Sequence, residues 1–205
     1  MPNFFVDDLA EPPGSKLGKG ASYPFVNTME TRVPSTERVF IGLGTNLGDL
    51  KAQIKHALLA LEASPGVQVV ATSGLYESEA LVKPGSPEQP RYLNAVTELE
   101  TRLSPLSLLD VLERIEYAAG REPASKASWA PRPLDLDLLA FGEQLWHDER
   151  LTVPHLELAS RRFVLAPWAE IAPDFMVPAP HDRTVRDLLC ACPDQLEIHR
   201  LSDGA

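Results

Sequence analysis

The sequence predicts an α+β fold, a ferredoxin-like split βαβ sandwich in which helices pack on a mainly antiparallel sheet. Three observations predict this class. Apolar runs typical of strands and amphipathic helical segments follow one another in the order strand, helix, strand, strand, helix, strand. Glycine and proline separate these segments. A hydrophobic share of 44% over 205 residues is enough to build one core.

The start of the chain does not share this pattern. Proline, glycine, serine and charged residues are scattered over residues 1–37 without the period of a helix or a strand. We expect these residues to form a flexible N-terminal arm and residues 38–205 to form the folded domain.

The first half of the pattern begins at residues 38–44, a β-branched and apolar run bounded by glycines that predicts a buried strand. Asn46 or Asp49 can cap the following helix, whose apolar side chains share one face up to Leu61. A Pro-Gly pair ends this helix, and residues 67–76 predict the next strand.

The second half repeats this order. Residues 92–101 alternate as a half-buried strand does, and Ser104 is the predicted N-cap of a second helix. Residues 134–141 carry leucines on one face and aspartates on the other. Shorter helical pieces are expected over two later stretches, residues 156–170 and 184–191.

Charge and composition exclude several classes of protein. Nineteen Lys and Arg against 29 Asp and Glu give a formal net charge of -10, which disfavours a general binder of nucleic acid or anionic membranes. The N-terminal residues do not form a signal peptide, and no apolar run is long enough to span a bilayer. Cys190 and Cys192 are too few for a disulfide framework or a four-ligand zinc site. We therefore expect a cytoplasmic protein that binds neither nucleic acid nor membranes.

The most informative residues are Asp135 and Asp137. On a strand, side chains at positions i and i+2 point to the same face, about 6.6 Å apart at the backbone. Two carboxylates on a sheet rich in leucine repel each other, and Mg²⁺, which prefers hard oxygen ligands, would compensate them. The alternative, from this pair alone, is a solvated face of an edge strand.

Positive side chains accompany the acidic pair. Arg132 lies between two prolines just before Asp135, and a guanidinium beside an acidic metal site is an arrangement that binds phosphate. The alternative is a simple salt bridge between these two residues. Further cationic candidates lie downstream, at Arg150, His155, Arg161 and Arg162. In a chain of this net charge the group indicates an electropositive pocket, although each arginine alone is typical of a solvated surface.

Other side chains could recognise a nucleotide or a flat ring. The Asn94 amide offers donors and an acceptor to the edge of a heterocycle, and Trp129 and Phe163 could stack on its faces. Glu116, with Glu113 one turn before it, could accept hydrogen bonds from a sugar or a base. The alternatives are a surface asparagine, core aromatics and exposed helix charges.

The glycine-rich run GLGTNLG is not a P-loop, because it lacks the terminal Lys-Ser/Thr. It is not a dinucleotide fingerprint either, because no acidic residue follows in the required context. Gly42 and Gly44 are better explained by close approach of the backbone to a ligand or a neighbouring strand.

Taken together, the segments FIGLGTNLGD, QPRYLNAV, GR before WAPRPLDLDLL, RLTVPH and R-x-F resemble the hydroxymethyl-dihydropterin pyrophosphokinases of folate biosynthesis. The resemblance covers residues 39–175, in the same order and with similar spacing. It implies an enzyme that transfers the pyrophosphoryl group of ATP to the hydroxymethyl oxygen of a dihydropterin and releases AMP. Mg²⁺ is the implied cofactor and ATP the co-substrate. A neighbouring enzyme of the folate pathway is a further candidate partner.

The resemblance also implies roles for single residues. Asp135 and Asp137 are expected to bind two Mg²⁺ ions that bridge the triphosphate. The implied pterin pocket consists of Gly44, Ser78, Leu81, Tyr92, Asn94, Trp129 and Phe163. The implied catalytic phosphate contacts are Arg121, Arg132, His155 and Arg161. Further implied nucleotide contacts are Glu113, Glu116, Lys126, Arg150 and Thr152.

Two loops, residues 80–90 and 120–129, are candidate lids that would exclude water from the site. The family often has a second basic residue where this chain has Pro123. Either Lys126 takes that role or the role is absent.

Two other functions remain open from the sequence. A nucleotidyl transferase or cyclase on the same kind of sheet would use the acidic pair for two metal ions but would bind no pterin. A binding module without activity would tolerate loss of Asp135. Only the pterin enzyme uses both the amide and aromatic side chains and the arginines.

Overall fold

The computed structural model describes residues 36–81, 89–121 and 131–202. Nearly all of the predicted arm lies outside these residues, so its flexibility stays a prediction. Lys126, Trp129 and most of the two candidate lids lie outside them as well. Within the described residues, none of the helices combines the length and the apolar character needed to cross a membrane.

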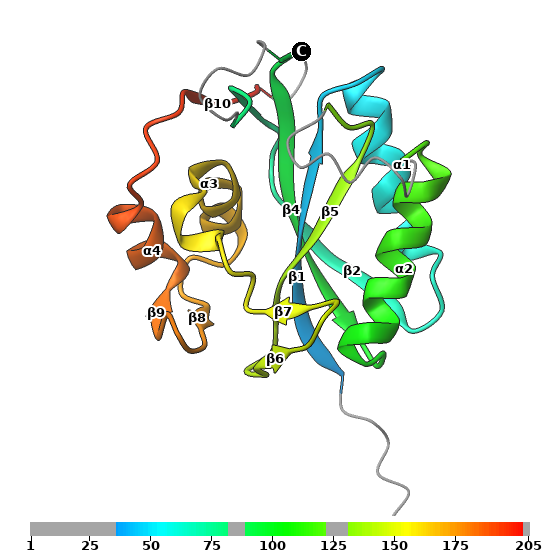
Figure 1. Cartoon of the computed structure of the whole chain (residues 1–205), viewed down its shortest axis with the longest axis vertical. Helices are drawn as coiled ribbons and strands as arrows, with labels where there is room; N and C mark the ends of the chain where they lie inside the picture. Colours follow the sequence, from blue (N-terminus) through cyan, green and yellow to red (C-terminus); the bar gives the residue numbers. More distant parts are fainter. Residues whose placement is uncertain (1–35, 82–88, 122–130, 203–205) are drawn as a thin grey trace, which may run out of the picture. The chain divides into compact units, whose positions relative to one another are not determined.

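An antiparallel sheet forms the centre of the described structure (Figure 1). Three long strands make its middle: β1 (Glu37–Thr45), β4 (Tyr92–Thr101) and β5 (Asp135–Phe141). Three shorter strands extend it beyond β4: β2 (Val67–Thr72), β3 (Tyr76–Ser78) and β10 (Ile198–Arg200). The strands lie in the order β10-β3-β4-β1-β5, and β2 also pairs with β4. Every pairing is antiparallel, so the predicted α+β class with a mainly antiparallel sheet is confirmed.

The strand predicted over residues 67–76 is interrupted. Pairing with β4 stops at Thr72 and resumes at Tyr76. Between them, the Ser73 N–H donates to the Val96 carbonyl, and the Ser73 hydroxyl accepts from the Val96 N–H at 3.0 Å. A side chain thus satisfies a backbone donor that a regular ladder would have paired. The local sequence does not indicate that a side-chain hydrogen bond replaces a ladder bond here.

Two long helices, α1 (Leu50–Glu62) and α2 (Pro105–Ala118), cover one face of the sheet (Figure 1). Their starts follow the sequence, because Asp49 accepts from the Ala52 N–H and Ser104 accepts from the Ser107 N–H. The core beneath them is built from alternating apolar side chains of the central strands. These are Val39, Ile41 and Leu43 of β1, Leu93, Ala95 and Leu99 of β4, and Leu136 and Leu138 of β5.

Shorter elements cover the opposite face: the 3-10 turn η1 (Leu158–Ser160), α3 (Arg162–Ile171) and α4 (Val185–Ala191). They bury Phe40, Val96 and Leu139 of the central strands in a second core around Trp168. Two small hairpins complete the fold, β6 (Trp146–His147) with β7 (Thr152–Val153) and β8 (Met176–Val177) with β9 (Arg183–Thr184). The helical pieces predicted in this part of the chain are confirmed.

The second core covers only part of this face. Along each central strand, the residues on this face change from large and apolar to polar or glycine. The changes are from Phe40 to Gly42 and Gly44 on β1, from Val96 to Asn94 on β4, and from Leu139 to Asp137 and Asp135 on β5. The part of the face that α3 and α4 leave uncovered is therefore polar and lacks bulky side chains.

Candidate active site

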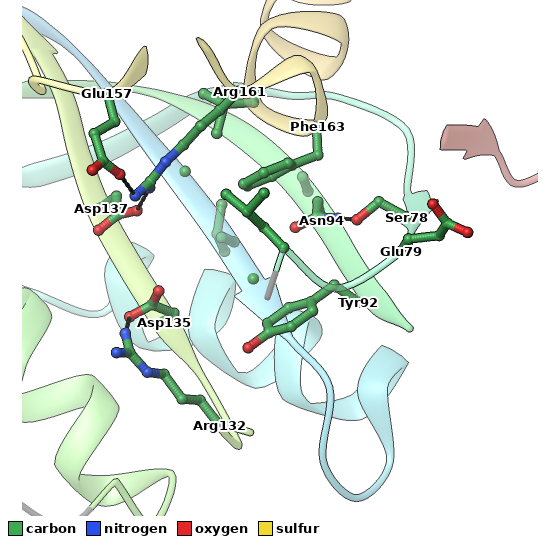
Figure 2. Close-up of a pocket in the computed structure, with 16 residues that line it drawn as sticks. Ser78, Glu79, Tyr92, Asn94, Arg132, Asp135, Asp137, Glu157, Arg161 and Phe163 are labelled. Carbon is green, nitrogen blue, oxygen red and sulfur yellow. Dashed lines mark hydrogen bonds and ion pairs between the residues drawn. The ribbon is translucent and has the colours of Figure 1, made fainter. Parts of the chain in front are cut away.

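A pocket of about 180 Å³ opens on the uncovered part of the sheet (Figure 2). Residues of β1, β4, β5 and α3 line it, together with the chain at the end of β3. Asp135 and Asp137 both face this pocket, as their spacing on a strand predicts. Their partners across the ladder are Gly44 and Gly42 of β1.

The two glycines keep the middle of the pocket open. A Cβ atom on Gly44 would lie 3.5 Å from the side-chain oxygen of Asn94 and 4.0 Å from the Cβ of Asp135. It would therefore occupy space between the amide side and the acidic side of the pocket. This placement agrees with the prediction that glycine here allows a ligand to approach the backbone.

Asp135 is held by two arginines from different elements. Arg132 Nη1 donates to Asp135 Oδ1 at 2.7 Å, and Arg121 Nη1 donates to the same oxygen at 2.9 Å. Arg132 precedes β5, whereas Arg121 follows α2. The salt bridge that was the alternative for Arg132 is present, and both of its members line the pocket.

Among the described residues, Asp137 has one arginine partner. Arg161 Nη1 donates to Asp137 Oδ2 at 3.2 Å, and Arg161 also pairs with Glu157. Burial raises the pKa of Asp137, and the nearby Asp135 carboxylate raises it further. The folded protein thus disfavours a bare carboxylate at this position, and a bound cation would relieve that penalty.

Glu116 is a buried residue near the end of α2, with 7% of its surface exposed. Its Oε1 accepts from the Leu136 N–H at 2.7 Å and also from Arg121 Nη1. Burial raises its pKa to about 7, although the hydrogen bond from Leu136 and the charge of Arg121 oppose that shift. Glu116 therefore links α2 to β5 and holds Arg121 beside Asp135. The exposed helix charge considered as an alternative is wrong for this residue.

The amide and aromatic side chains lie across the pocket from the acidic pair (Figure 2). Asn94 Nδ2 donates to Ser78 Oγ at 2.9 Å and to the Tyr76 carbonyl at 3.4 Å. The amide oxygen is thereby left as the group that can accept from a ligand. Tyr92 and Phe163 lie on either side of Asn94 in Figure 2. Burial raises the pKa of Tyr92, and Asp135 adds to that shift, so its phenol stays a neutral donor.

Most of the predicted site residues meet in this pocket. Those that line it are Gly44, Ser78, Leu81, Tyr92, Asn94, Arg132, Asp135, Asp137, Arg161 and Phe163. Arg121 and Glu116 do not line it, but Arg121 donates to Asp135 and Glu116 accepts from the Leu136 N–H of the same strand.

His155 follows β7 and is close enough for its charge to interact with that of Asp137, but it does not line the pocket. Its Nδ1 accepts from the Glu157 N–H at 3.2 Å, which leaves Nε2 as the donor. Burial lowers the pKa of His155, and the Asp137 carboxylate opposes that shift. Its role as a phosphate contact stays a prediction.

Three further predicted nucleotide contacts lie outside the pocket lining. Arg150 Nη2 donates to Glu113 Oε2 at 2.9 Å and to Asp110 Oδ1 at 2.8 Å. Thr152 is hydrogen-bonded to His147 at 3.0 Å between hydroxyl and ring nitrogen. Glu113, Arg150 and Thr152 therefore stay predictions.

Two residues that shape the site were not predicted for it. Asn46 was a candidate helix cap, but Asp49 fills that position, and the buried Asn46 side chain accepts from the Arg132 N–H at 2.7 Å. Glu157 holds Arg161 beside Asp137. An isolated Asn after a strand and an isolated Glu in a loop give no sequence signal for these roles.

The acidic pair fits Mg²⁺ as far as its own oxygens go, because both carboxylates are hard ligands that share one pocket. Within the described ranges, no group of three or more His, Cys, Asp or Glu side chains could hold a metal ion by itself. Phosphate oxygens and waters would have to complete the coordination shell, which is usual for Mg²⁺ at nucleotide sites.

The chain is similar to known proteins over most of its folded part. The family model of 7,8-dihydro-6-hydroxymethylpterin-pyrophosphokinase (HPPK) matches residues 40–173. A Pseudomonas aeruginosa protein named 2-amino-4-hydroxy-6-hydroxymethyldihydropteridine pyrophosphokinase is 46% identical over 157 residues, 77% of this chain and 93% of that protein. A protein of the same name from Haemophilus influenzae is 43% identical over 139 residues, 68% of this chain and 84% of that protein.

Longer proteins also match. The folic acid synthesis protein fol1 of Schizosaccharomyces pombe is 36% identical over 156 residues, 76% of this chain and 20% of that protein. A crystal structure of Plasmodium falciparum HPPK-DHPS A437G with STZ-DHP superposes with a TM-score of 0.59 at 15% identity, over 78% of this chain and 46% of that chain. That likeness shows the fold alone. Because the family model and the bacterial relatives match most of its folded part, the chain belongs to the 7,8-dihydro-6-hydroxymethylpterin-pyrophosphokinase family.

Proposed function

We propose that the pocket described above is where this chain performs the reaction of its family. That reaction transfers pyrophosphate from ATP to the hydroxymethyl group of 6-hydroxymethyl-7,8-dihydropterin and yields the pterin diphosphate and AMP. One observation carries the assignment. A single pocket joins an acidic pair with arginines on one side to an amide with aromatic rings on the other.

The acidic side is the proposed phosphate site. Arg121, Arg132 and Arg161 each contact Asp135 or Asp137, so three guanidinium groups are concentrated within reach of one ligand. Each already has a carboxylate partner. A bound polyphosphate would offer these arginines phosphate oxygens in place of carboxylate oxygens. Guanidinium groups suit this exchange because their fork of donors fits phosphate oxygens as well as carboxylates.

The amide side is the proposed pterin site. The Asn94 oxygen can accept from the ring N–H and amino groups of a pterin, and Ser78 fixes the amide in that orientation. Phe163 and Tyr92 supply aromatic surface for a flat bicyclic ring. Gly44 leaves room for the hydroxymethyl group to reach toward the phosphates.

Asp135 and Asp137 are the proposed magnesium ligands, and two ions are proposed. When bound, magnesium supplies charge neutralisation for the phosphate oxygens. The remaining work is done by this chain's residues: the arginines orient the triphosphate, and Asn94 with the aromatic rings orients the acceptor.

The transfer forms one bond and breaks one. The hydroxymethyl oxygen attacks the β-phosphorus in line with the oxygen that joins the α- and β-phosphates. That bridging oxygen leaves with AMP, and the hydroxyl proton passes to water. No covalent enzyme intermediate is required, so positioning and electrostatic stabilisation account for catalysis.

Two finer assignments belong to the same proposal. The sheet order β10-β3-β4-β1-β5, with helices between β1 and β2 and between β4 and β5, supports a ferredoxin-like split βαβ arrangement. The matched part of the longer proteins named fol1 and HPPK-DHPS supports a second folate-pathway enzyme as a partner for this chain.

One assay tests the function. Purified protein is incubated with ATP, Mg²⁺ and 6-hydroxymethyl-7,8-dihydropterin, and nucleotides and pterins are separated by chromatography. We expect AMP and pterin diphosphate in equal amounts, and neither when the pterin is omitted or the metal is chelated. ADP as the nucleotide product, or AMP without the pterin, would contradict the proposal.

A further inference from the structure

A carboxylate outside the pocket joins three segments of the chain. Glu170, in the last turn of α3, accepts four hydrogen bonds. Its Oε1 accepts from the Gly74 N–H at 3.2 Å and from Arg200 Nη2 at 3.1 Å. Its Oε2 accepts from the Tyr76 hydroxyl at 2.8 Å and from Arg200 Nε at 3.3 Å. Only 29% of the Glu170 side-chain surface is exposed.

The donors are packed closely. Arg200 of β10 pairs with Tyr76 of β3, and the next residue along, Leu201, donates its N–H to the Leu75 carbonyl at 2.8 Å. A Cβ atom on Gly74 would lie 2.8 Å from the Arg200 guanidinium. Glycine at this position therefore allows the guanidinium to lie flat over the backbone while it holds Glu170.

The two elements that Glu170 joins each end at the pocket. Strand β3 ends at Ser78, and the Tyr76 carbonyl and Ser78 hydroxyl both accept from the Asn94 amide. Helix α3 carries Phe163 in its first turn, and this ring lines the pocket near the Asn94 amide. Glu170 therefore lies at the end of α3 far from Phe163, whereas on β3 it contacts Tyr76, the residue whose carbonyl accepts from the Asn94 amide.

We propose that Glu170 is a positioning residue that fixes the separation of β3 and α3, and thereby the position of the Phe163 ring relative to the Asn94 amide at the site for a flat heterocycle. The inference rests on the proposed pterin assignment of that side of the pocket. Asp135 and Asp137 lie on β5, which has no contact with Glu170 among its four hydrogen bonds. Arg161, the proposed phosphate contact at the start of α3, is held separately by Asp137 and Glu157. Loss of Glu170 should therefore weaken pterin binding far more than ATP binding.

The test is a comparison of steady-state constants for Glu170→Gln and Glu170→Ala with those of the wild-type chain. We expect KM for the dihydropterin to rise about tenfold, the size of coupling seen between contacting groups, while KM for ATP and kcat change less than about twofold. Glu62→Gln is the matched control. Glu62 is also a helix carboxylate that accepts from a strand, the Val69 N–H at 2.7 Å, but neither of the elements it joins, α1 and β2, contributes a residue to the pocket.

Two further variants separate positioning from general stability. Tyr76→Phe removes one donor to Glu170 without removing its ring, and its effect on the dihydropterin KM should not add to that of Glu170→Gln if both act through one contact. Should Glu170→Ala not fold, Glu170→Gln and Tyr76→Phe carry the test.

An unchanged dihydropterin KM in folded Glu170→Gln would overturn the inference. So would a parallel change in both KM values and kcat, which indicates a general structural role. A wild-type chain that forms no pterin-dependent AMP refutes the proposed function itself, and this inference with it.

Discussion

One face of the sheet is covered by α1 and α2, and the other face has two parts, one covered by α3 and α4 and one uncovered. Both parts are built on the same three strands, but their side chains differ in chemistry. Where α3 and α4 cover it, the strands present Phe40, Val96 and Leu139, all fully or almost fully buried. Where the face is uncovered, they present glycine, an amide and two carboxylates. The strands are continuous through both parts. Stability and binding are therefore separated along each strand, within one sheet.

This difference gives each part its own energetic balance. The covered part gains from burying apolar surface against helices. In the uncovered part, the raised pKa of Asp137, caused by burial and by Asp135, shows that the folded state bears a cost to keep two carboxylates together. Side chains in the covered part should control folding, and those in the uncovered part should control turnover.

The largest effect is expected from Asp137→Ala. Removal of one of two proposed magnesium ligands should lower AMP formation by about 10⁴-fold or more. The free energy of unfolding should hardly fall, because the carboxylate that is removed is repelled by Asp135 and lies in a polar pocket, not in a core. Chromatographic assay of AMP and urea unfolding check the two halves of this prediction. Turnover close to that of the wild-type chain would rule out the proposed metal site.

The converse change is Phe40→Ala in the covered part. Phe40 packs against Trp168 and Phe175, with ring centroids 5.0 and 4.7 Å away. Its truncation should lower the free energy of unfolding by about 3–5 kcal/mol, measured by urea titration. The kcat of the protein that remains folded should be retained. Leu59→Ala, at a helix position that is 59% exposed, is the control with little effect on stability. A folded but inactive Phe40→Ala protein would show that the two parts are not separable.

The sequence was sufficient for this separation wherever a local pattern encoded it. The i, i+2 spacing placed Asp135 and Asp137 on one face because strand geometry allows nothing else. The order of strands and helices followed from period and caps, as at Asp49 and Ser104. These features need only a few neighbouring residues to be defined.

Contacts between distant segments could not be predicted in this way. Glu116 is a charged residue on a helix, and only the approach of β5 makes it a buried acceptor for the Leu136 N–H. Ser73 interrupts a strand through a bond to Val96 that no spacing rule contains. Glu157 acquires a role only through the position of Arg161. In each case the meaning of the residue depends on a partner that the fold supplies.

A smaller effect on turnover is expected from Arg161→Ala. Arg161 is one of three arginines at the acidic pair, so its loss removes one donor of several. The expected cost in kcat/KM is about 2–4 kcal/mol, by analogy with single donors to a developing charge. The neighbouring Arg162 is exposed and does not line the pocket, so Arg162→Ala is the matched control and should be near wild type. Equal losses in both variants would indicate a general effect of charge in place of a specific contact.

The smallest effect is expected at Glu170, the residue at the end of α3 that contacts Tyr76 of β3 and Arg200 of β10. Burial tends to raise the pKa of Glu170, but hydrogen bonds from Arg200, Tyr76 and the Gly74 N–H outweigh it and lower the pKa. A carboxyl group with a lowered pKa stabilises the folded state above its unfolded-state pKa, and this stabilisation is lost as the pH falls through the folded-state pKa. Glu170→Gln should therefore be less stable than wild type by about 1–3 kcal/mol at pH 7, as for hydrogen bonds to a charged group. In urea titrations at a series of pH values, the difference in free energy of unfolding between wild type and Glu170→Gln should shrink in acid. A difference that is constant with pH would show that the charge of Glu170 does not stabilise the contact of α3 with β3 and β10.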